Sequence, residues 1–254
     1  MKSLYFTEEH DLFRQSVRQF VEKEIKPFGD QWEEDKNIPR ELFIKLGEQG
    51  FLGINHDEAF GGSKADIFYT CAYLEEIAKC GYAGVCAAVS VHQYMATNHL
   101  AEAGNNELKE RFLRPSIEGK KVAAIAITEP FGGSDVQSMR TTAVKDGDHY
   151  VINGSKTFIT NGHLCDFAVV ACKTDDKAGI NGISLIVIVA IICSVLSSLL
   201  TVVIVNKTGI LNGTTSTSQG TSSKIVVSSD KSTNVYQAVS EKAKPSVVGI
   251  TTTT

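Results

Sequence analysis

The sequence predicts an α+β protein: an all-α N-terminal part, a truncated antiparallel β part, then one transmembrane helix and a flexible tail. Three observations support this order. Apolar residues recur with the helical period of about 3.6 up to about Gly119, and the period then changes to the two-residue alternation of strands. Residues 183–205 carry no charge.

The first helix is predicted to begin after Thr7, whose hydroxyl suits the N-cap position. Glu8 and Glu9 complement the positive start of a helix, and Pro27 with Gly29 ends it. One helical face carries the apolar residues Leu12, Phe13, Val17, Phe20, Val21 and Ile25.

Three more helices are predicted before the period changes. They cover residues 39–50, 66–78 and 83–103, with Pro39 at the start of the first and Gly104 after the last. These helices complete an N-terminal domain of residues 1–120.

The next segment, residues 121–185, reads as a set of short strands. Residues 122–128 and 167–172 are apolar runs, and residues 141–145 and 149–152 flank Asp146-Gly147, a strong hairpin signal. We therefore expect a meandering antiparallel arrangement.

Residues 183–205 are long enough to span a bilayer, which needs about 20 apolar residues as a helix. The sequence thus predicts a single-pass membrane protein with a cytoplasmic N-terminal part. The alternative is a buried pair of strands, because residues 186–192 are rich in β-branched side chains.

Residues 206–234 are dense in Ser, Thr and Gly, which indicates a flexible linker. Residues 235–244 could form a short amphipathic helix that Pro245 ends.

Composition excludes several function classes. The net charge of −4 argues against a nucleic-acid-binding surface. The six cysteines show no C-x-x-C spacing, so neither a zinc site nor a disulfide framework is expected. His92 and His99 share a helix face without a carboxylate or cysteine beside them, and a packed or surface role is expected for them rather than metal binding.

A strand that ends in a Gly-rich turn bracketed by hydroxyl side chains forms the first chemical motif. Such a turn presents backbone N–H groups to an anionic or carbonyl-bearing ligand. The motif reads Ala126-Ile127-Thr128-Glu129-Pro130-Phe131-Gly132-Gly133-Ser134-Asp135. Alone it is also compatible with an ordinary turn.

The second motif reads Asn153-Gly154-Ser155-Lys156-Thr157-Phe158-Ile159-Thr160-Asn161-Gly162. At this separation, the pair of motifs closely resembles the acyl-CoA dehydrogenase family, especially its long-chain enzymes. The resemblance covers residues 1–185 and includes Phe60-Gly61-Gly62 and Asn181-Gly182-Ile183. Two departures are Phe131, where many members have a small residue, and Phe158, where others have Trp.

The resemblance implies a helical domain, a middle β domain and a C-terminal helical bundle, with FAD between the last two. It further implies α,β-dehydrogenation of an acyl-CoA substrate, with electron-transferring flavoprotein as the electron acceptor. The cofactor-binding residues that it assigns are Ile125, Ala126, Ile127, Thr128, Glu129, Pro130, Phe131, Gly132, Gly133, Ser134, Phe158, Ile159 and Thr160. Ser134 would also reach the acyl-CoA, and Thr160 would direct a hydroxyl toward the flavin.

No catalytic base is assigned to this sequence, since the family's glutamate belongs to the C-terminal bundle. Glu129 lies in the flavin-binding turn and is not expected to replace it. We therefore expect this chain alone to be inactive.

Two alternatives concern the rear of the chain. Residues 183–254 resemble the membrane anchor, linker and leading segment of an HtrA-like serine protease, with residues 235–254 at its start. Alternatively, the chain is a chimera of two reading frames without a native function, because residues 183–185 continue directly into the apolar run.

Overall fold

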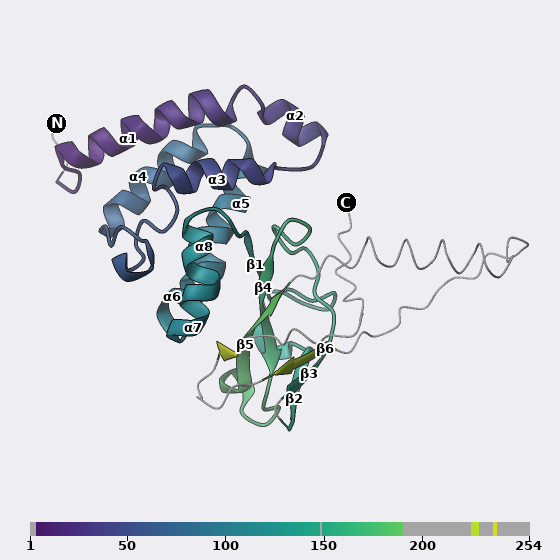
Figure 1. Cartoon of the computed structure of the whole chain (residues 1–254). Coiled ribbons are helices and arrows are strands. Elements are labelled where there is room, and N and C mark those ends of the chain that lie inside the picture. Colours follow the sequence, from purple (N-terminus) through teal and green to yellow (C-terminus); the bar gives the residue numbers. More distant parts are fainter. Residues whose placement is uncertain (1–3, 148, 190–224, 229–235, 238–254) are drawn as a thin grey trace, which may run out of the picture. The chain divides into compact units, whose positions relative to one another are not determined.

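The computed structural model of the chain describes residues 4–147, 149–189, 225–228 and 236–237 (Figure 1). Two compact units emerge. Unit 1 comprises Met1–Ala126 and Ile159–Val169, and unit 2 comprises Ile127–Phe158 and Val170–Thr254.

The α-helices of the described residues all belong to unit 1, where π-helical turns (η1, η3, η4) and a 3-10 turn (η2) accompany them. In chain order they are α1 (Glu8–Phe20), η1 (Val21–Ile25), α2 (Gly29–Glu34), α3 (Arg40–Glu48), η2 (Glu58–Phe60), α4 (Ile67–Ala78), α5 (Ala83–Ser90), η3 (Val91–Ala96), α6 (Thr97–Ala103), α7 (Asn106–Leu108), η4 (Lys109–Leu113) and α8 (Arg114–Ile117).

The four helices predicted from periodicity are confirmed. The first continues through η1 to Ile25, and α5, η3 and α6 together make the helix predicted over residues 83–103. Helix α2 and the helical stretch from α7 to α8 were not predicted. The second of these begins where the Asn105 side chain accepts the Leu108 N–H at 2.8 Å, a cap that the sequence reading overlooked.

The core of unit 1 lies between α1, η1, α3, α4 and α5, and α1 packs along α4 (Figure 1). A buried carboxylate strengthens this contact. Glu76 of α4 accepts hydrogen bonds from Arg18 of α1 at 2.9 and 3.0 Å and from Lys79 at 2.7 Å. The bonds from Arg18 lower the pKa of Glu76 to about 2 against the opposing effect of burial. The carboxylate is therefore charged at neutral pH.

The strands form a single sheet with the order β6-β3-β2-β4-β5-β7, and β1 pairs with β4 (Figure 1). Their bounds are β1 (Ala123–Ala126), β2 (Thr142–Asp146), β3 (His149–Asn153), β4 (Phe167–Lys173), β5 (Ile183–Val189), β6 (Ile225–Ser228) and β7 (Tyr236–Gln237), with the 3-10 turns η5 (Val136–Ser138) and η6 (Gly179–Gly182) between them. The predicted hairpin is confirmed, since β2 pairs antiparallel with β3 from Thr142↔Asn153 to Asp146↔His149.

The prediction of a purely antiparallel sheet is wrong. Strand β4 pairs with β2 in parallel, at Thr142↔Lys173, and β5 pairs with β7 in parallel. The chain between β2 and β4 contains β3 and the connection of residues 154–166, and parallel strands need a crossover of a dozen or more residues. The length of this connection permits the parallel pairing.

The prediction of a transmembrane helix over residues 183–205 is also wrong for its first seven residues, which form β5. Ile186 and Val187 are buried there. Their β-branched side chains suit a strand, as the alternative interpretation of this run held. None of the helices in the described residues is both long and apolar enough to cross a membrane. Residues 190–205 lie outside the described part of the chain.

The predicted linker over residues 206–234 is not wholly irregular, because Ile225–Ser228 pair antiparallel with β3 as β6. This segment is the β-branched exception within a Ser/Thr/Gly-rich stretch. Of residues 235–254, which resemble the start of the protease region, Tyr236–Gln237 are described, as β7. The remaining rear residues, and the predictions for them, lie outside the described chain.

A buried histidine joins three elements of unit 1. His92 of η3 accepts the Ala123 N–H of β1 at Nδ1, at 3.0 Å, and its Nε2 donates to the Ser116 carbonyl of α8 at 3.1 Å. Both bonds require the neutral ring with its proton on Nε2. Burial lowers the pKa of His92 to about 4. This histidine therefore has the packing role that the sequence predicted.

Acid should destabilise unit 1 through His92. The pKa of His92 is about 4 when folded and 6.5 when unfolded, so the unfolded state binds the extra proton between these values. Stability is therefore full above pH 6.5 and falls by up to about 3 kcal/mol as the pH drops to 4. Urea unfolding of the wild type and of His92→Gln at pH 7 and pH 4.5 measures the effect.

The variant should be less stable at pH 7 by about 1–3 kcal/mol, since one of the two buried backbone groups loses its partner. Its stability should also change less between the two pH values. Equal losses in both proteins on acidification would contradict a titrating His92.

Candidate functional site

The Gly-rich motif forms a closed turn in unit 2. The Glu129 N–H donates to the Gly132 carbonyl at 2.9 Å, and the Gly132 N–H donates back to the Glu129 carbonyl at 3.1 Å. A side chain at position 133 would meet Thr128 atoms at 3.2 and 3.3 Å, so the chain passes closely over Thr128. Glycine suits position 133 because it removes this close contact.

A buried carboxylate lies at the base of this turn. Glu129 is 6% exposed and accepts the backbone N–H groups of Arg140 at 2.7 Å and Thr141 at 2.9 Å. The Thr141 hydroxyl also donates to it, and Lys156 Nζ lies 2.9 Å from Oε1. Four donors from three residues therefore fix the carboxylate.

These donors decide the charge of Glu129. Burial alone would raise its pKa, but the bonds from Thr141, Arg140 and Lys156 outweigh burial and lower the pKa to about 2. The carboxylate is ionised at neutral pH and has little tendency to take up a proton. This electrostatic setting suits a structural anchor.

Lys156 connects the second motif to the first. Besides the ion pair with Glu129, its ammonium donates to the Ile127 carbonyl at 2.9 Å, and the residue is 8% exposed. One residue later, the Thr157 N–H donates to the Thr128 carbonyl at 3.0 Å. The structure thus brings together the parts of both motifs that belong to unit 2.

A glycine of the second motif makes this approach possible. A Cβ atom at Gly154 would lie 2.2 Å from Thr141 Oγ1 and 2.7 Å from Thr141 Cα. Thr141 is also the residue whose hydroxyl and N–H bind Glu129. Any side chain at position 154 would therefore displace the group that holds the carboxylate.

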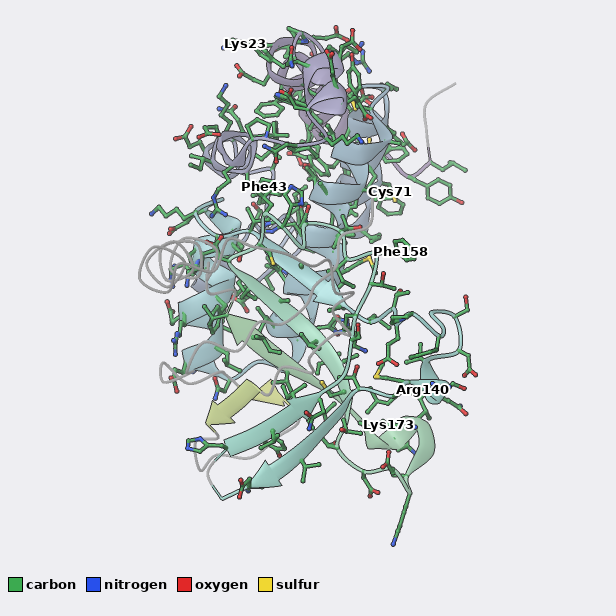
Figure 2. All side chains as sticks on the ribbon, turned by 90° about the vertical axis from the view of Figure 1, so that its right-hand side faces the viewer. Lys23, Phe43, Cys71, Arg140, Phe158 and Lys173 are labelled. Carbon is green, nitrogen blue, oxygen red and sulfur yellow. The ribbon has the colours of Figure 1, made fainter. Side chains whose placement is uncertain are left out.

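Two aromatic side chains of the predicted site are open to solvent, and one of them, Phe158, is labelled in Figure 2. Phe158 is 73% exposed with a φ of +54°, and Phe131 is 71% exposed. A positive φ is unfavourable for a bulky residue and is commonly found at ligand-binding positions. The Arg140 guanidinium lies over the Phe131 ring, 4.0 Å from its centroid. The turn thus carries exposed aromatic surface beside a cation.

The other predicted site residues belong to unit 1. Ile125 and Ala126 end β1 and are buried, Ile159 is buried, and Thr160 is half-buried. The next residue, Asn161, has a φ of +64° and donates from Nδ2 to the carbonyls of Ala88 at 2.8 Å and Ala123 at 3.3 Å. This amide fixes the end of the second motif against β1.

The sequence reading missed three residues that shape the site: Arg140, Thr141 and Lys156. Lys156 belongs to the second motif, but the family resemblance gave it no role. A lysine between a strand and a turn is nevertheless a recognisable partner for a carboxylate such as that of Glu129. Arg140 and Thr141 act mainly through backbone N–H groups, which leave no signal in side-chain chemistry.

Comparison with known families matches two consecutive regions. Residues 7–120 match the family described as "Acyl-CoA dehydrogenase, N-terminal domain", and residues 124–190 match "Acyl-CoA dehydrogenase, middle domain". These regions contain both motifs and reach from α1 to β5, apart from residues 121–123.

Individual relatives support the same family assignment. The short-chain specific acyl-CoA dehydrogenase of Clostridium acetobutylicum is 40% identical over 183 residues, which are 72% of this chain and 48% of that protein. The crystal structure of an acyl-CoA dehydrogenase from Geobacillus kaustophilus is 43% identical with a TM-score of 0.70, over 74% of this chain and 50% of that one.

A glutaryl-CoA dehydrogenase from Mycobacterium smegmatis, crystallised in complex with FADH2, is 30% identical with a TM-score of 0.67. The match covers 73% of this chain and 46% of that one. The chain therefore spans about half the length of the relatives that it matches. The long-chain specific acyl-CoA dehydrogenase of Rattus norvegicus is likewise 40% identical, over 185 residues that are 72% of this chain and 43% of that protein, so the predicted likeness to long-chain members is confirmed but is shared with a short-chain enzyme.

The ion pair between Glu129 and Lys156 should contribute strongly to the stability of unit 2. Glu129→Gln or Lys156→Met alone should each cost about 3 kcal/mol, because each leaves one buried charge without its partner. The double variant should cost clearly less than the two single losses together. Urea unfolding of the four proteins measures this coupling.

Glu118→Gln is a suitable control, since it removes the exposed pair of Glu118 with Lys120 and should cost less than about 1 kcal/mol. Additive losses in the cycle, or a control as damaging as Glu129→Gln, would mean that the buried pair is not coupled as described.

Proposed function

The chain belongs to the acyl-CoA dehydrogenase family over residues 7–120 and 124–190, and from this premise we propose that it is part of an FAD-dependent dehydrogenase of acyl-CoA thioesters. The observation that carries the proposal is the joining of the two family motifs in unit 2 by Lys156 and Thr157.

The residues of unit 2 fit a flavin in two respects. Phe158 holds an uncovered aromatic ring in a strained backbone conformation, which suits a planar ligand that would stack on it. The turn from Glu129 to Ser134 lies beside the Arg140 guanidinium, and this positive charge suits a pyrophosphate. Both features lie at the exposed side of the motif, whereas Glu129 and Lys156 are buried.

We propose for these residues the roles that the family resemblance implies. Residues 127–134 would bind the cofactor through their backbone and through the hydroxyls of Thr128 and Ser134, and Ser134 would also contact the acyl-CoA. Phe158 would cover one face of the ring system and exclude water from it. Ile125, Ala126, Ile159 and Thr160 complete the proposed set, with the Thr160 hydroxyl directed at the flavin.

The chemistry that FAD supplies when bound is acceptance of a hydride from the β-carbon of the thioester. The residues of this chain position and shield that cofactor. We propose electron-transferring flavoprotein as the redox partner, in line with the family.

Glu129 is unsuited to the proton abstraction that the reaction also needs. It is the only carboxylate among the residues proposed for the site, and its low pKa and four hydrogen bonds leave it a weak base. We therefore expect turnover to require a carboxylate outside this set. FAD binding, rather than dehydrogenation, is the activity that tests the proposal directly.

Titration of the full chain with FAD, followed by flavin fluorescence and absorbance, should show saturable binding. Phe158→Ala should weaken binding about five- to tenfold, since a lost stacking contact costs about 1–1.4 kcal/mol. Val144→Ala on β2 is a matched control, because Val144 is a 60% exposed apolar residue of the same unit outside both motifs.

Saturable binding that Phe158→Ala weakens and Val144→Ala leaves unchanged would support the site. No binding by the folded wild type, or equal affinities of all three proteins, would refute the role assigned to Phe158 and the turn.

A further inference from the structure

Two cysteines of unit 1, neither of them among the proposed flavin-binding residues, lie next to each other. Cys80 follows the end of α4, and Cys86 lies in the first turn and a half of α5. Their sulfur atoms are 3.7 Å apart. A disulfide has an S–S length of about 2 Å, so the two sulfurs need to approach by less than about 2 Å.

The two thiols are not equivalent. Each sulfur lies 3.6 Å from a backbone carbonyl to which its thiol can donate, that of Tyr82 for Cys80 and that of Ile77 for Cys86, and Cys80 Sγ also accepts the Tyr82 N–H at 3.3 Å. The hydrogen bond from Cys86, helped by the Tyr82 N–H and by the charge of Lys26, lowers the pKa of Cys80 to about 6 against the effect of burial. The same bond and burial raise the pKa of Cys86. One thiolate thus has a neutral thiol beside it.

We propose that Cys80 and Cys86 form a peroxide-reactive thiol pair that closes to an intramolecular disulfide. In the first step, Cys80 sulfur attacks a peroxide oxygen, the O–O bond breaks, and hydroxide leaves. Cys80 is oxidised to a sulfenic acid and the peroxide is reduced. In the second step, Cys86 sulfur attacks Cys80 sulfur, and the sulfenic hydroxyl leaves as water with the Cys86 proton.

The balance is two thiols and one peroxide giving one disulfide and two waters. The resulting bond would tie the end of α4 to the start of α5 across Gly81, which has a φ of +88°. Cys80 is only 5% exposed, but its partner Cys86 is half-buried, so the pair lies at the edge of the core.

The other described cysteines lack this combination. Cys71 on α4 is exposed (Figure 2). Cys165 and Cys172 are buried, and burial raises the pKa of Cys165 to about 11 and that of Cys172 to about 12. Cys71 therefore provides the matched control for simple thiol oxidation.

The test treats the full chain with hydrogen peroxide, blocks the remaining thiols, and maps peptides by mass spectrometry without reduction. The expected product is a Cys80–Cys86 disulfide that a dithiol reverses. Cys71→Ser should form it unchanged, and Cys80→Ser should abolish it. Cys86→Ser should instead give a sulfenic acid at Cys80 that dimedone traps.

Peptide mapping of the oxidised wild type needs no variant, so it tests for the Cys80–Cys86 disulfide even if a serine variant folds poorly. Recovery of Cys80 and Cys86 as free thiols after Cys71 is fully oxidised would overturn the proposal. So would a disulfide that joins either cysteine to a different partner.

Discussion

The buried ion pair of Glu129 with Lys156 is the constraint on which the candidate site depends. A carboxylate and an ammonium are costly to bury, and here the cost is offset by two backbone N–H groups, a threonine hydroxyl and a backbone carbonyl. These groups come from two separate segments of unit 2, residues 140–141 and Ile127, while the two charges come from one motif each. Satisfying the charges therefore fixes several loops at once.

In unit 1, polar side chains likewise fix the strand β1. The backbone around β1 is held by polar side chains rather than by apolar packing alone. Asp166 accepts the Val122 N–H at 2.7 Å and pairs with Arg40 at 2.6 Å, while Asn161 and His92 bind the Ala123 carbonyl and N–H. Each of these four side chains has a partner with a defined direction, so the backbone on both sides of β1 is specified geometrically.

The residues of the candidate site likewise fall into a buried structural group and an exposed group. The ionised, fully bonded Glu129 supports the turn and is a poor acid or base, while the exposed rings and hydroxyls nearby are left for a ligand. The strained backbone at Phe158 is consistent with this division, because such strain persists only where the surroundings impose it. The thiol pair at Cys80 and Cys86 lies between two helices of unit 1 and uses none of these residues.

The sequence by itself determined the elements whose signals are local. The apolar stripe of α1, the helical period of residues 66–78 and the Asp146-Gly147 turn act on neighbouring residues, so these predictions held. The two motifs likewise identified the family. Only the tertiary structure decided the parallel pairing of β2 with β4, the strand at Ile183–Val189 and the meeting of Glu129 with Lys156. The first and the last of these features join residues far apart in the chain. The strand depends on whether an apolar segment can pair with a neighbouring strand. Local periodicity predicts neither kind of contact.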